Sequence, residues 1–159
     1  MGYPRAEIEA TVARYVAVRH RIDAGNGGWR DLVPFFTDDV VFIDPAWGRV
    51  EGIEAFSRFL EESMAGLDDW TFPVEFTAVV DDNVIVKWTE EIPKPDGTMA
   101  TQSGWSRLIY AGDGKFRYEE DVLNMAHVLE DIASSGWQPT GPMHLPPKQP
   151  VRDWSIPEG

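Results

Sequence analysis

The apolar residues at the start of the chain recur with the period of an α-helix. Over the stretch from Pro4 to Ala24, the residues that share one helical face are Ile8, Val12, Tyr15, Val16 and Ile22. Pro4 suits a first helical turn, and the glycine-rich segment from Gly25 to Gly28 ends the helix. Two more helices are predicted, a short one over 29–36 and a longer one over 53–65 with a clear apolar stripe.

The period then changes from helical to alternating, which is typical of β-strands. The predicted strands are Val40–Asp44, Trp70–Val80, Val84–Ile92, Thr98–Ala111 and Lys115–Leu123. Turn-forming clusters rich in Asp, Asn, Gly and Pro separate the last four of them, and a short closing helix is predicted over 126–135. This order predicts an α+β domain, in which the helices pack on one face of a curved antiparallel sheet.

The chain is predicted to contain one domain and a tail. Its length of 159 residues suits a single hydrophobic core, which we assign to residues 1–138. Half of the 12 prolines lie from Pro139 to Pro157, so residues 139–159 are predicted to be an extended tail. The tail also carries apolar side chains, and we expect Trp154 to be buried against its own subunit or a dimer partner.

Charge and composition exclude several classes of function. The net charge of −13 disfavours nucleic acid and anionic membranes as partners, because both require clustered basic residues. The absence of cysteine removes thiol chemistry and is compatible with a reducing cytoplasm, where we expect the protein to be located. The three histidines have no metal-ligand spacing, and no glycine-rich phosphate loop follows a strand, so we expect neither metal nor nucleotide cofactor.

Asp44 ends an apolar strand immediately before Pro45, and this position has two interpretations. An Asp-Pro pair commonly starts a turn. An acid at the end of a buried strand also suits a carboxylate at the mouth of a pocket, where burial penalises its charged form.

Three segments, in this order and spacing, resemble the nuclear transport factor 2-like superfamily. They are "ARYVAVRHRIDAG", "FFTDDVVFIDPAWGRVEGIEAF" and "GDGKFRYEEDVLNM". The superfamily includes ketosteroid isomerases, SnoaL-like polyketide cyclases and limonene-epoxide hydrolases. The resemblance implies a cone-shaped fold, an apolar pocket and a homodimer that forms through the outer face of the sheet.

The ketosteroid isomerase pattern assigns catalytic roles to two residues of this chain. Asp44 matches the catalytic base and Tyr15 matches the tyrosine that donates a hydrogen bond to the oxyanion. Ser106 takes the place of that family's protonated aspartate, and its hydroxyl can still donate a hydrogen bond.

The other two families match the strand acids. Asp121 falls on the acid/base aspartate of SnoaL-like cyclases and on the final-strand aspartate of the epoxide hydrolases. Glu90 matches the middle-strand acid of the epoxide hydrolases, whereas Trp88 takes the place of their bridging arginine and Phe42 that of a tyrosine.

Alternation along the strands supports a convergence of these side chains. Trp88 and Glu90 share one face of their strand, and Glu119 and Asp121 share one face of the last strand. If both faces line the interior, apolar surroundings and like charges raise some of the carboxyl pKa values, as acid/base work near neutral pH requires. The alternative is a solvated acidic end of the sheet.

Together these observations predict a cofactor-free enzyme that acts on a neutral, hydrophobic carbonyl compound. The predicted catalytic residues are Asp44, Tyr15 and Asp121, and the predicted substrate-binding residues are Phe42, Phe56, Phe59, Trp88, Glu90, Ser106 and Glu119. Arg19, one turn beyond Tyr15, is a further candidate that either pairs with an interior acid or extends to the surface. An epoxide hydrolase and a non-catalytic binding or dimerisation domain remain as alternatives.

Overall fold

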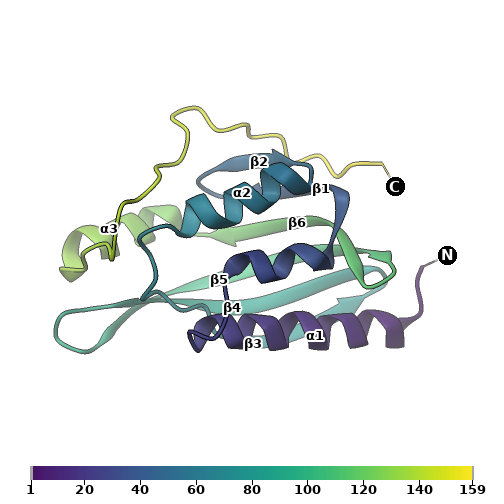
Figure 1. The fold of residues 1–159 in the computed structure, drawn as a ribbon, viewed down its shortest axis with the longest axis horizontal. Coiled ribbons are helices and arrows are strands. Elements are labelled where there is room, and N and C mark those ends of the chain that lie inside the picture. The colour runs from purple at the N-terminus through teal and green to yellow at the C-terminus, as the bar shows by residue number, and fades with distance from the viewer. Residues whose placement is uncertain (1, 159) are drawn as a thin grey trace.

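A computed structural model describes residues 2–158 and confirms an α+β fold with helices on one face of a curved sheet (Figure 1). The elements are α1 (Arg5–Asp23), the 3₁₀ helix η1 (Trp29–Phe35), β1 (Phe36–Asp44), β2 (Gly48–Glu51), α2 (Ile53–Met64), β3 (Val74–Val80), β4 (Asn83–Pro93), β5 (Met99–Gly112), β6 (Lys115–Leu123) and α3 (Met125–Ser135). The six strands have the order β2-β1-β6-β5-β4-β3.

The expectation of a purely antiparallel sheet is wrong at one pairing. Strands β3 to β6 form an antiparallel meander, but β1 runs parallel to β6, with Phe42 opposite Glu119. Strand β1 forms an antiparallel hairpin with β2. No hairpin joins β1 to β6, because β2, α2 and β3 to β5 lie between them in the chain. A parallel neighbour is therefore compatible with the connections.

Several element boundaries also differ from the predicted ones. Strand β1 begins four residues earlier than predicted, at Phe36, and β2 was not predicted at all. The predicted strand from Trp70 begins only at Val74, preceded by an isolated bridge between Thr71 and Glu91. Both errors arise where a strand is short or twisted and shows little alternation.

The main core lies between the helices and the inner face of the sheet. On α1 the buried apolar residues are Ile8, Val12, Tyr15 and Val18, and α2 buries Phe56, Phe59 and Leu60. The rings of Phe36, Phe42 and Phe56 pack together, with centroid separations of 4.6 and 5.3 Å. A smaller apolar cluster covers part of the outer face and consists of Val41, Ile43, Ile109 and Tyr118.

The tail after α3 runs along the protein past α2 to β2 (Figure 1). Arg49 holds it in place: the Arg49 amide donates to the Val151 carbonyl at 2.9 Å, and Nη1 donates to the Ser155 carbonyl at 2.7 Å. Gly48 permits this contact, because a side chain there would overlap the Val151 carbonyl, and its φ of +79° also favours glycine. Arg117 binds the Pro157 carbonyl at 2.6 Å.

Trp154 does not have the predicted burial within its own chain. Its side chain is 48% exposed, although the tail on both sides of it is held by the hydrogen bonds of Arg49. These bonds reach only backbone carbonyls, so they fix the path of the tail without directing its side chains inward. Burial of Trp154 against a dimer partner stays a prediction.

Removing the tail is expected to destabilise the protein. Truncation after Gln138 eliminates the carbonyl acceptors of Arg49, and Arg49→Gln weakens the same contacts in the full chain. We expect Arg49→Gln to cost about 1–2 kcal/mol, since the bonds are charge-assisted but partly at the surface. That cost corresponds to a melting temperature lower by roughly 2–8 °C, and the truncation should lower it at least as far.

Differential scanning calorimetry measures both variants, with Arg58→Gln on the exposed side of α2 as the matched control. An unchanged melting temperature in the truncated protein would show that the tail is not part of the folded structure.

Candidate active site

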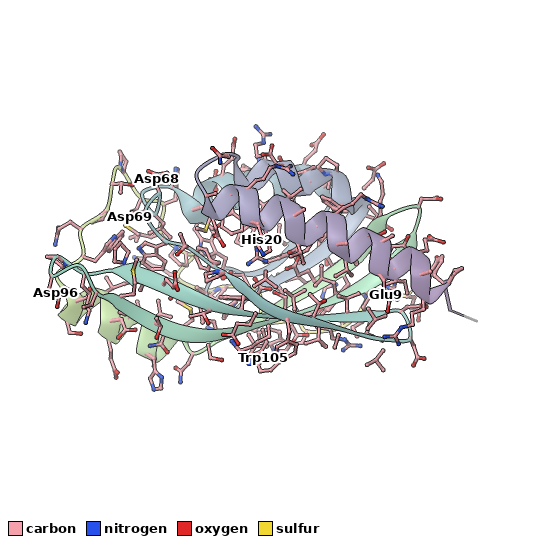
Figure 2. The ribbon with its side chains drawn as sticks, turned by 90° about the horizontal axis from the view of Figure 1, so that it is seen from below. Glu9, His20, Asp68, Asp69, Asp96 and Trp105 are labelled. Carbon is pink, nitrogen blue, oxygen red and sulfur yellow. The ribbon has the colours of Figure 1, made fainter. Side chains whose placement is uncertain are left out.

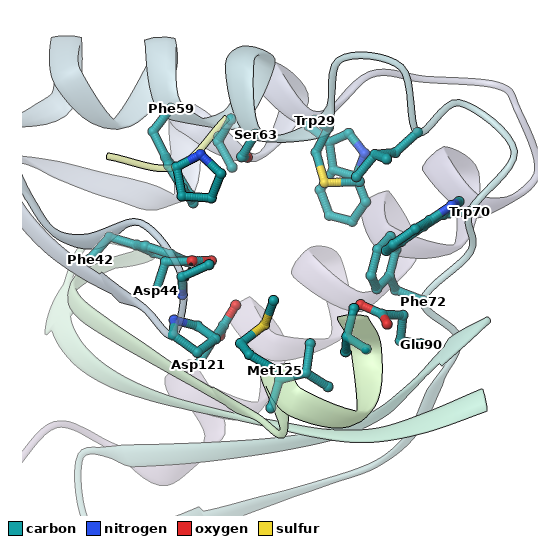
Figure 3. Close-up of a pocket in the computed structure, with 18 of the residues that line it drawn as sticks. Trp29, Phe42, Asp44, Phe59, Ser63, Trp70, Phe72, Glu90, Asp121 and Met125 are labelled. Atoms are coloured by element: carbon teal, nitrogen blue, oxygen red, sulfur yellow. Dashed lines mark hydrogen bonds between the residues drawn. The ribbon is translucent and has the colours of Figure 1, made fainter. Parts of the chain in front are cut away.

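A cavity of about 280 Å³ lies between the inner face of the sheet and the three α-helices (Figure 3). Its wall is mostly aromatic and aliphatic, with contributions from η1, α2, α3 and the ends of β1, β4 and β6. Four carboxyl groups interrupt this apolar lining, those of Asp44, Glu90, Glu119 and Asp121. The volume is near the lower end of the range for small-molecule pockets.

Asp44 serves both a turn and the cavity. Its Oδ1 accepts hydrogen bonds from the amides of Ala46 and Trp47, each at 2.7 Å, so the carboxyl group anchors the turn between β1 and β2. The same carboxyl group lines the cavity, and Oδ2 is left for a ligand. Burial raises the pKa of Asp44, while the two amide donors oppose that shift by stabilising the anion.

Asp121 is held by a relay that starts at Trp88. The indole Nε1 of Trp88 donates to Ser106 Oγ at 2.9 Å, and Ser106 Oγ donates to Asp121 Oδ1 at 2.5 Å. Gly104 makes this possible, because a Cβ atom there would be 2.2 Å from the Trp88 ring. The pKa of Asp121 is raised to about 7, mainly by burial and to a smaller extent by the Asp44 carboxyl, while the Ser106 hydroxyl acts in the opposite direction.

Tyr15, Arg19 and Glu119 form a second buried chain of polar groups. Arg19 Nη1 donates to Tyr15 Oη at 3.3 Å, and Tyr15 Oη donates to Glu119 Oε1 at 3.5 Å. Arg19 Nη2 also donates to the Phe72 carbonyl at 3.2 Å. Burial and the neighbouring Asp121 carboxyl raise the pKa of Glu119 well above its ordinary value, while the Arg19 guanidinium acts in the opposite direction.

Glu90 lies on the other side of the cavity from Asp44 and Asp121 (Figure 3). Its side chain is buried, and its Oε1 has no hydrogen-bond partner among residues 2–158. Burial raises the pKa of Glu90 to about 7, with further contributions from the carboxyl groups of Asp131 and Asp44.

The predicted site residues fall into two groups in the structure. Those that line the cavity are Tyr15, Phe42, Asp44, Phe56, Phe59, Trp88, Glu90, Glu119 and Asp121, together with Arg19. Ser106 does not line it, because its hydroxyl is buried behind Asp121. Ser106 therefore positions Asp121 and does not face a ligand, contrary to its predicted role in substrate binding.

Other residues of the cavity wall were missed at the sequence level. They are mainly Trp29, Trp70, Phe72, the α3 residues Met125, Val128 and Ile132, and the tail segment Met143–Pro146. The apolar stripe of α3 was a usable signal, because an amphipathic helix must cover an apolar surface. The apolar residues of the tail indicated that it packs on the protein, but they did not indicate where along the surface it lies.

The electrostatic balance of the cavity favours protonated acids. Among the described residues that line it, four carboxyl groups are balanced by one guanidinium, that of Arg19. Like charges in an apolar environment disfavour simultaneous ionisation, so the group retains protons near neutral pH. Such a set can accept a proton at one position and donate one at another.

Among residues 2–158, no group of three or more histidine, aspartate or glutamate side chains has an arrangement suited to a metal ion. None of the helices in that range is long and apolar enough to cross a membrane.

Comparison with known proteins identifies the family. Residues 8–119 match the SnoaL-like domain family, so the chain belongs to that family, within the nuclear transport factor 2-like superfamily. The resemblance seen in the sequence is thereby confirmed. The search of curated proteins finds no match.

Solved structures share the fold at low sequence identity. A protein from Jannaschia sp. CCS1, provisionally named a SnoaL-like polyketide cyclase, is 23% identical, with a TM-score of 0.65 over 84% of this chain and 99% of its own. AclR from Streptomyces galilaeus, provisionally named a hydroxylase, is 18% identical, with a TM-score of 0.61 over 82% and 98%. TerC, crystallised with polyporic acid, is 23% identical, with a TM-score of 0.57 over 80% and 98%.

The raised pKa of Asp121 predicts a specific dependence of stability on pH. Because the pKa rises from an ordinary 3.8 to about 7, the folded protein holds a proton that the unfolded chain releases between these values. The stability contributed by this proton is present below pH 4 and is lost as the pH rises to 7. Asp121→Asn removes the titrating group. The unfolding free energy of this variant should therefore increase relative to that of wild type as the pH rises from 4 to 7.

The expected gain is a few kcal/mol, at about 1.4 kcal/mol for each pKa unit. Urea denaturation at pH 4, 5.5 and 7 measures it, with Asp39→Asn on the exposed part of β1 as a control that makes the same chemical change. A difference that does not change with pH for Asp121→Asn would mean that Asp121 ionises normally.

Proposed function

We propose that the protein is a cofactor-independent acid/base enzyme that acts on a neutral, hydrophobic carbonyl compound. The observation that carries this proposal is the pairing of Asp44 and Asp121 in one apolar cavity, with Asp44 Oδ2 open to a ligand. Their different surroundings separate their roles, because two amides stabilise the Asp44 anion whereas the pKa of Asp121 lies near neutrality. Carboxyl groups of different acidity are what general base and general acid catalysis need.

The proposed reaction begins when Asp44 removes a proton from the carbon next to the substrate carbonyl. The electron pair of that C–H bond moves to the carbonyl oxygen and gives an enolate. Tyr15 donates a hydrogen bond to this oxygen, since Arg19 already donates to Tyr15 Oη and leaves the phenolic proton for an acceptor. The long bond from Tyr15 to Glu119 is the one that a ligand oxygen replaces.

Asp121 completes the cycle as the acid. It returns a proton to a different carbon in an isomerisation, or to the alkoxide formed when the enolate attacks a second carbonyl in an aldol-type cyclisation. The proton taken up by Asp44 then replaces the one that Asp121 has lost, so the catalyst is regenerated. Trp88 and Ser106 hold Asp121 in the required orientation.

The alternatives receive less support. Epoxide hydrolysis of the limonene-epoxide type requires an arginine between two acids, and among the described residues no arginine hydrogen-bonds to Asp121 or Glu90. A non-catalytic binding domain would have acids that are paired or exposed, with no upward shift of their pKa values. Burial raises the pKa of all four acids in the cavity.

The family and its neighbours agree with this class of substrate. The names of the similar structures include polyketide cyclases, and TerC was crystallised with polyporic acid.

Solvent exchange tests the first chemical step without knowledge of the product. In D₂O, the wild-type protein should accelerate the exchange of α-protons for deuterium in a panel of hydrophobic ketones that includes 5-androstene-3,17-dione and 2-acetyl-6-hydroxynaphthalene. Asp44→Asn should lower the exchange rate by about 100-fold or more, because the amide cannot accept the proton. Proton NMR measures the rate for each ketone.

The matched control is Asp39→Asn, which makes the same chemical change on the exposed part of the same strand. Equal exchange rates with wild type and Asp44→Asn would remove Asp44 from the mechanism.

We also propose that two copies of the chain associate through the outer face of the sheet. Trp105 lies on the sheet face away from α1 (Figure 2), and Phe76, Trp105 and Val122 are 49%, 41% and 54% exposed. The buried outer cluster of Val41, Ile43, Ile109 and Tyr118 lies on the same face, and the rings of Phe76 and Trp105 pack edge to face there. Such surfaces commonly mark interaction sites.

A charge placed in this surface should dissociate the dimer. Trp105→Glu is expected to raise the dimer dissociation constant by about tenfold or more, since it removes an exposed aromatic side chain from the interface and introduces a charge there. Light scattering coupled to gel filtration measures the mass, with Arg58→Glu on α2 as the control. A wild-type protein that is monomeric at all accessible concentrations would refute the proposal.

A further inference from the structure

Glu90 is a cavity acid that the proposed reaction does not use. Its side chain is 3% exposed, and Oε1 is buried without a hydrogen-bond partner among residues 2–158. The other three cavity acids each have a partner: backbone amides for Asp44, Ser106 for Asp121 and Tyr15 for Glu119. A buried oxygen that lacks a partner costs free energy, so a group that fills the cavity is the expected partner.

The protein itself offers Glu90 little alternative. Its nearest polar neighbour across the sheet is Gln102, but the Gln102 amide donates to Asp131 on α3 at 2.6 Å. The inward neighbours of Glu90 along β4 are Trp88 and Ile92, and both are buried in the apolar core. The carboxyl group is thus directed at the cavity and surrounded by apolar walls (Figure 3).

The charge around Glu90 limits the chemistry of its partner. Burial and the acids Asp131 and Asp44 raise its pKa to about 7, so the neutral carboxylic acid is well populated at neutral pH. A neutral carboxylic acid has one O–H donor and a carbonyl acceptor. A ligand hydroxyl group also donates and accepts hydrogen bonds, so it can satisfy the O–H donor and the carbonyl acceptor of Glu90 at the same time. An anionic ligand group is disfavoured by Glu90 itself and by the neighbouring carboxyl groups of Asp131 and Asp44.

We propose that Glu90 forms a second polar subsite that binds a hydroxyl group at the end of the substrate remote from the reacting carbonyl. This inference rests on the proposed function, and it narrows the substrate to a hydrophobic hydroxyketone with oxygens at opposite ends. Asp44, Asp121 and Tyr15 engage the ketone end, and Glu90 engages the hydroxyl. The aromatic wall between them binds the ring system and is formed by Trp29, Phe59, Trp70, Phe72 and Trp88.

Matched ligands test the subsite directly. We compare 2-acetyl-6-hydroxynaphthalene, 2-acetylnaphthalene and 2-acetyl-6-(aminomethyl)naphthalene, which differ only in the group remote from the ketone. Isothermal titration calorimetry with the wild-type protein should show the hydroxyl compound binding about tenfold more tightly than the unsubstituted one, as one satisfied buried hydrogen bond allows.

The preference should depend on Glu90. Glu90→Met should abolish it, and Glu90→Gln should retain part of it, because the amide still donates and accepts. Glu90→Met also removes a buried acid, so we expect it to melt no lower than wild type, which separates loss of the subsite from loss of folding. The ratio of the deuterium exchange rates of 2-acetyl-6-hydroxynaphthalene and 2-acetylnaphthalene is measured in the same variant and should fall relative to wild type, because only the remote hydroxyl group distinguishes the two ketones.

The outcomes separate this inference from the proposed function. If no ketone exchanges deuterium but Glu90→Met still abolishes the hydroxyl preference, the acid/base function fails and the subsite stands. If exchange occurs and the wild type shows no hydroxyl preference, or Glu90→Met retains it, the subsite is overturned. Tighter binding of the aminomethyl compound would overturn it in favour of a cation site, and failure of all three ligands to bind would overturn it as well.

Discussion

The arrangement of the site depends on the cost of burying carboxyl groups away from water. An ionised acid in an apolar cavity is strongly disfavoured unless donors or cations surround it. The protein provides donors for three of its four acids and leaves one oxygen of Glu90 without any. Two backbone amides oppose the upward shift of the pKa at Asp44, whereas the pKa values of Asp121 and Glu90 both rise to about 7.

The hydrogen bonds of the site arise from three kinds of structure: a turn, a pair of strands and a helix. The amides that bind Asp44 belong to the turn that the Asp-Pro pair itself creates. The Ser106 hydroxyl reaches Asp121 because β5 and β6 pair in a register that places these two residues opposite each other. Arg19 reaches Tyr15 because the two are four residues apart on α1, one helical turn. Local sequence, strand pairing and helix geometry thus each contribute one part of the electrostatics.

The covering of the cavity by other parts of the chain also affects the pKa values of its acids. Helix α3 and the tail segment Met143–Pro146 cover apolar wall that would otherwise be exposed to water. A lower local dielectric strengthens the interactions among the buried charges and maintains the raised pKa values. The hydrogen bonds of Arg49 to the tail therefore affect the site indirectly, since they fix the path of the chain beyond the cavity.

The sequence by itself determined the elements other than β2 and much of which face of them points inward. Helical spacing predicted the buried positions Ile8, Val12 and Tyr15 of α1 and the apolar stripe of α2. Alternation predicted that Glu90 shares a face with Trp88 and Asp121 with Glu119. These are local properties, because the direction of a side chain follows from the backbone period. The two interpretations of Asp44, a turn and a cavity acid, were both present in the Asp-Pro pair, and the structure contains both.

Only the tertiary structure decided which groups meet. The parallel pairing of β1 with β6, the position of Ser106 behind Asp121 and the arrival of the tail at the cavity all join segments far apart in the chain. No short pattern encodes such contacts, since they depend on the register and path that the whole chain adopts when it buries its apolar surface. The exposure of Trp154 has the same cause: hydrophobic character predicts a tendency to be buried, but a partner surface must lie within reach.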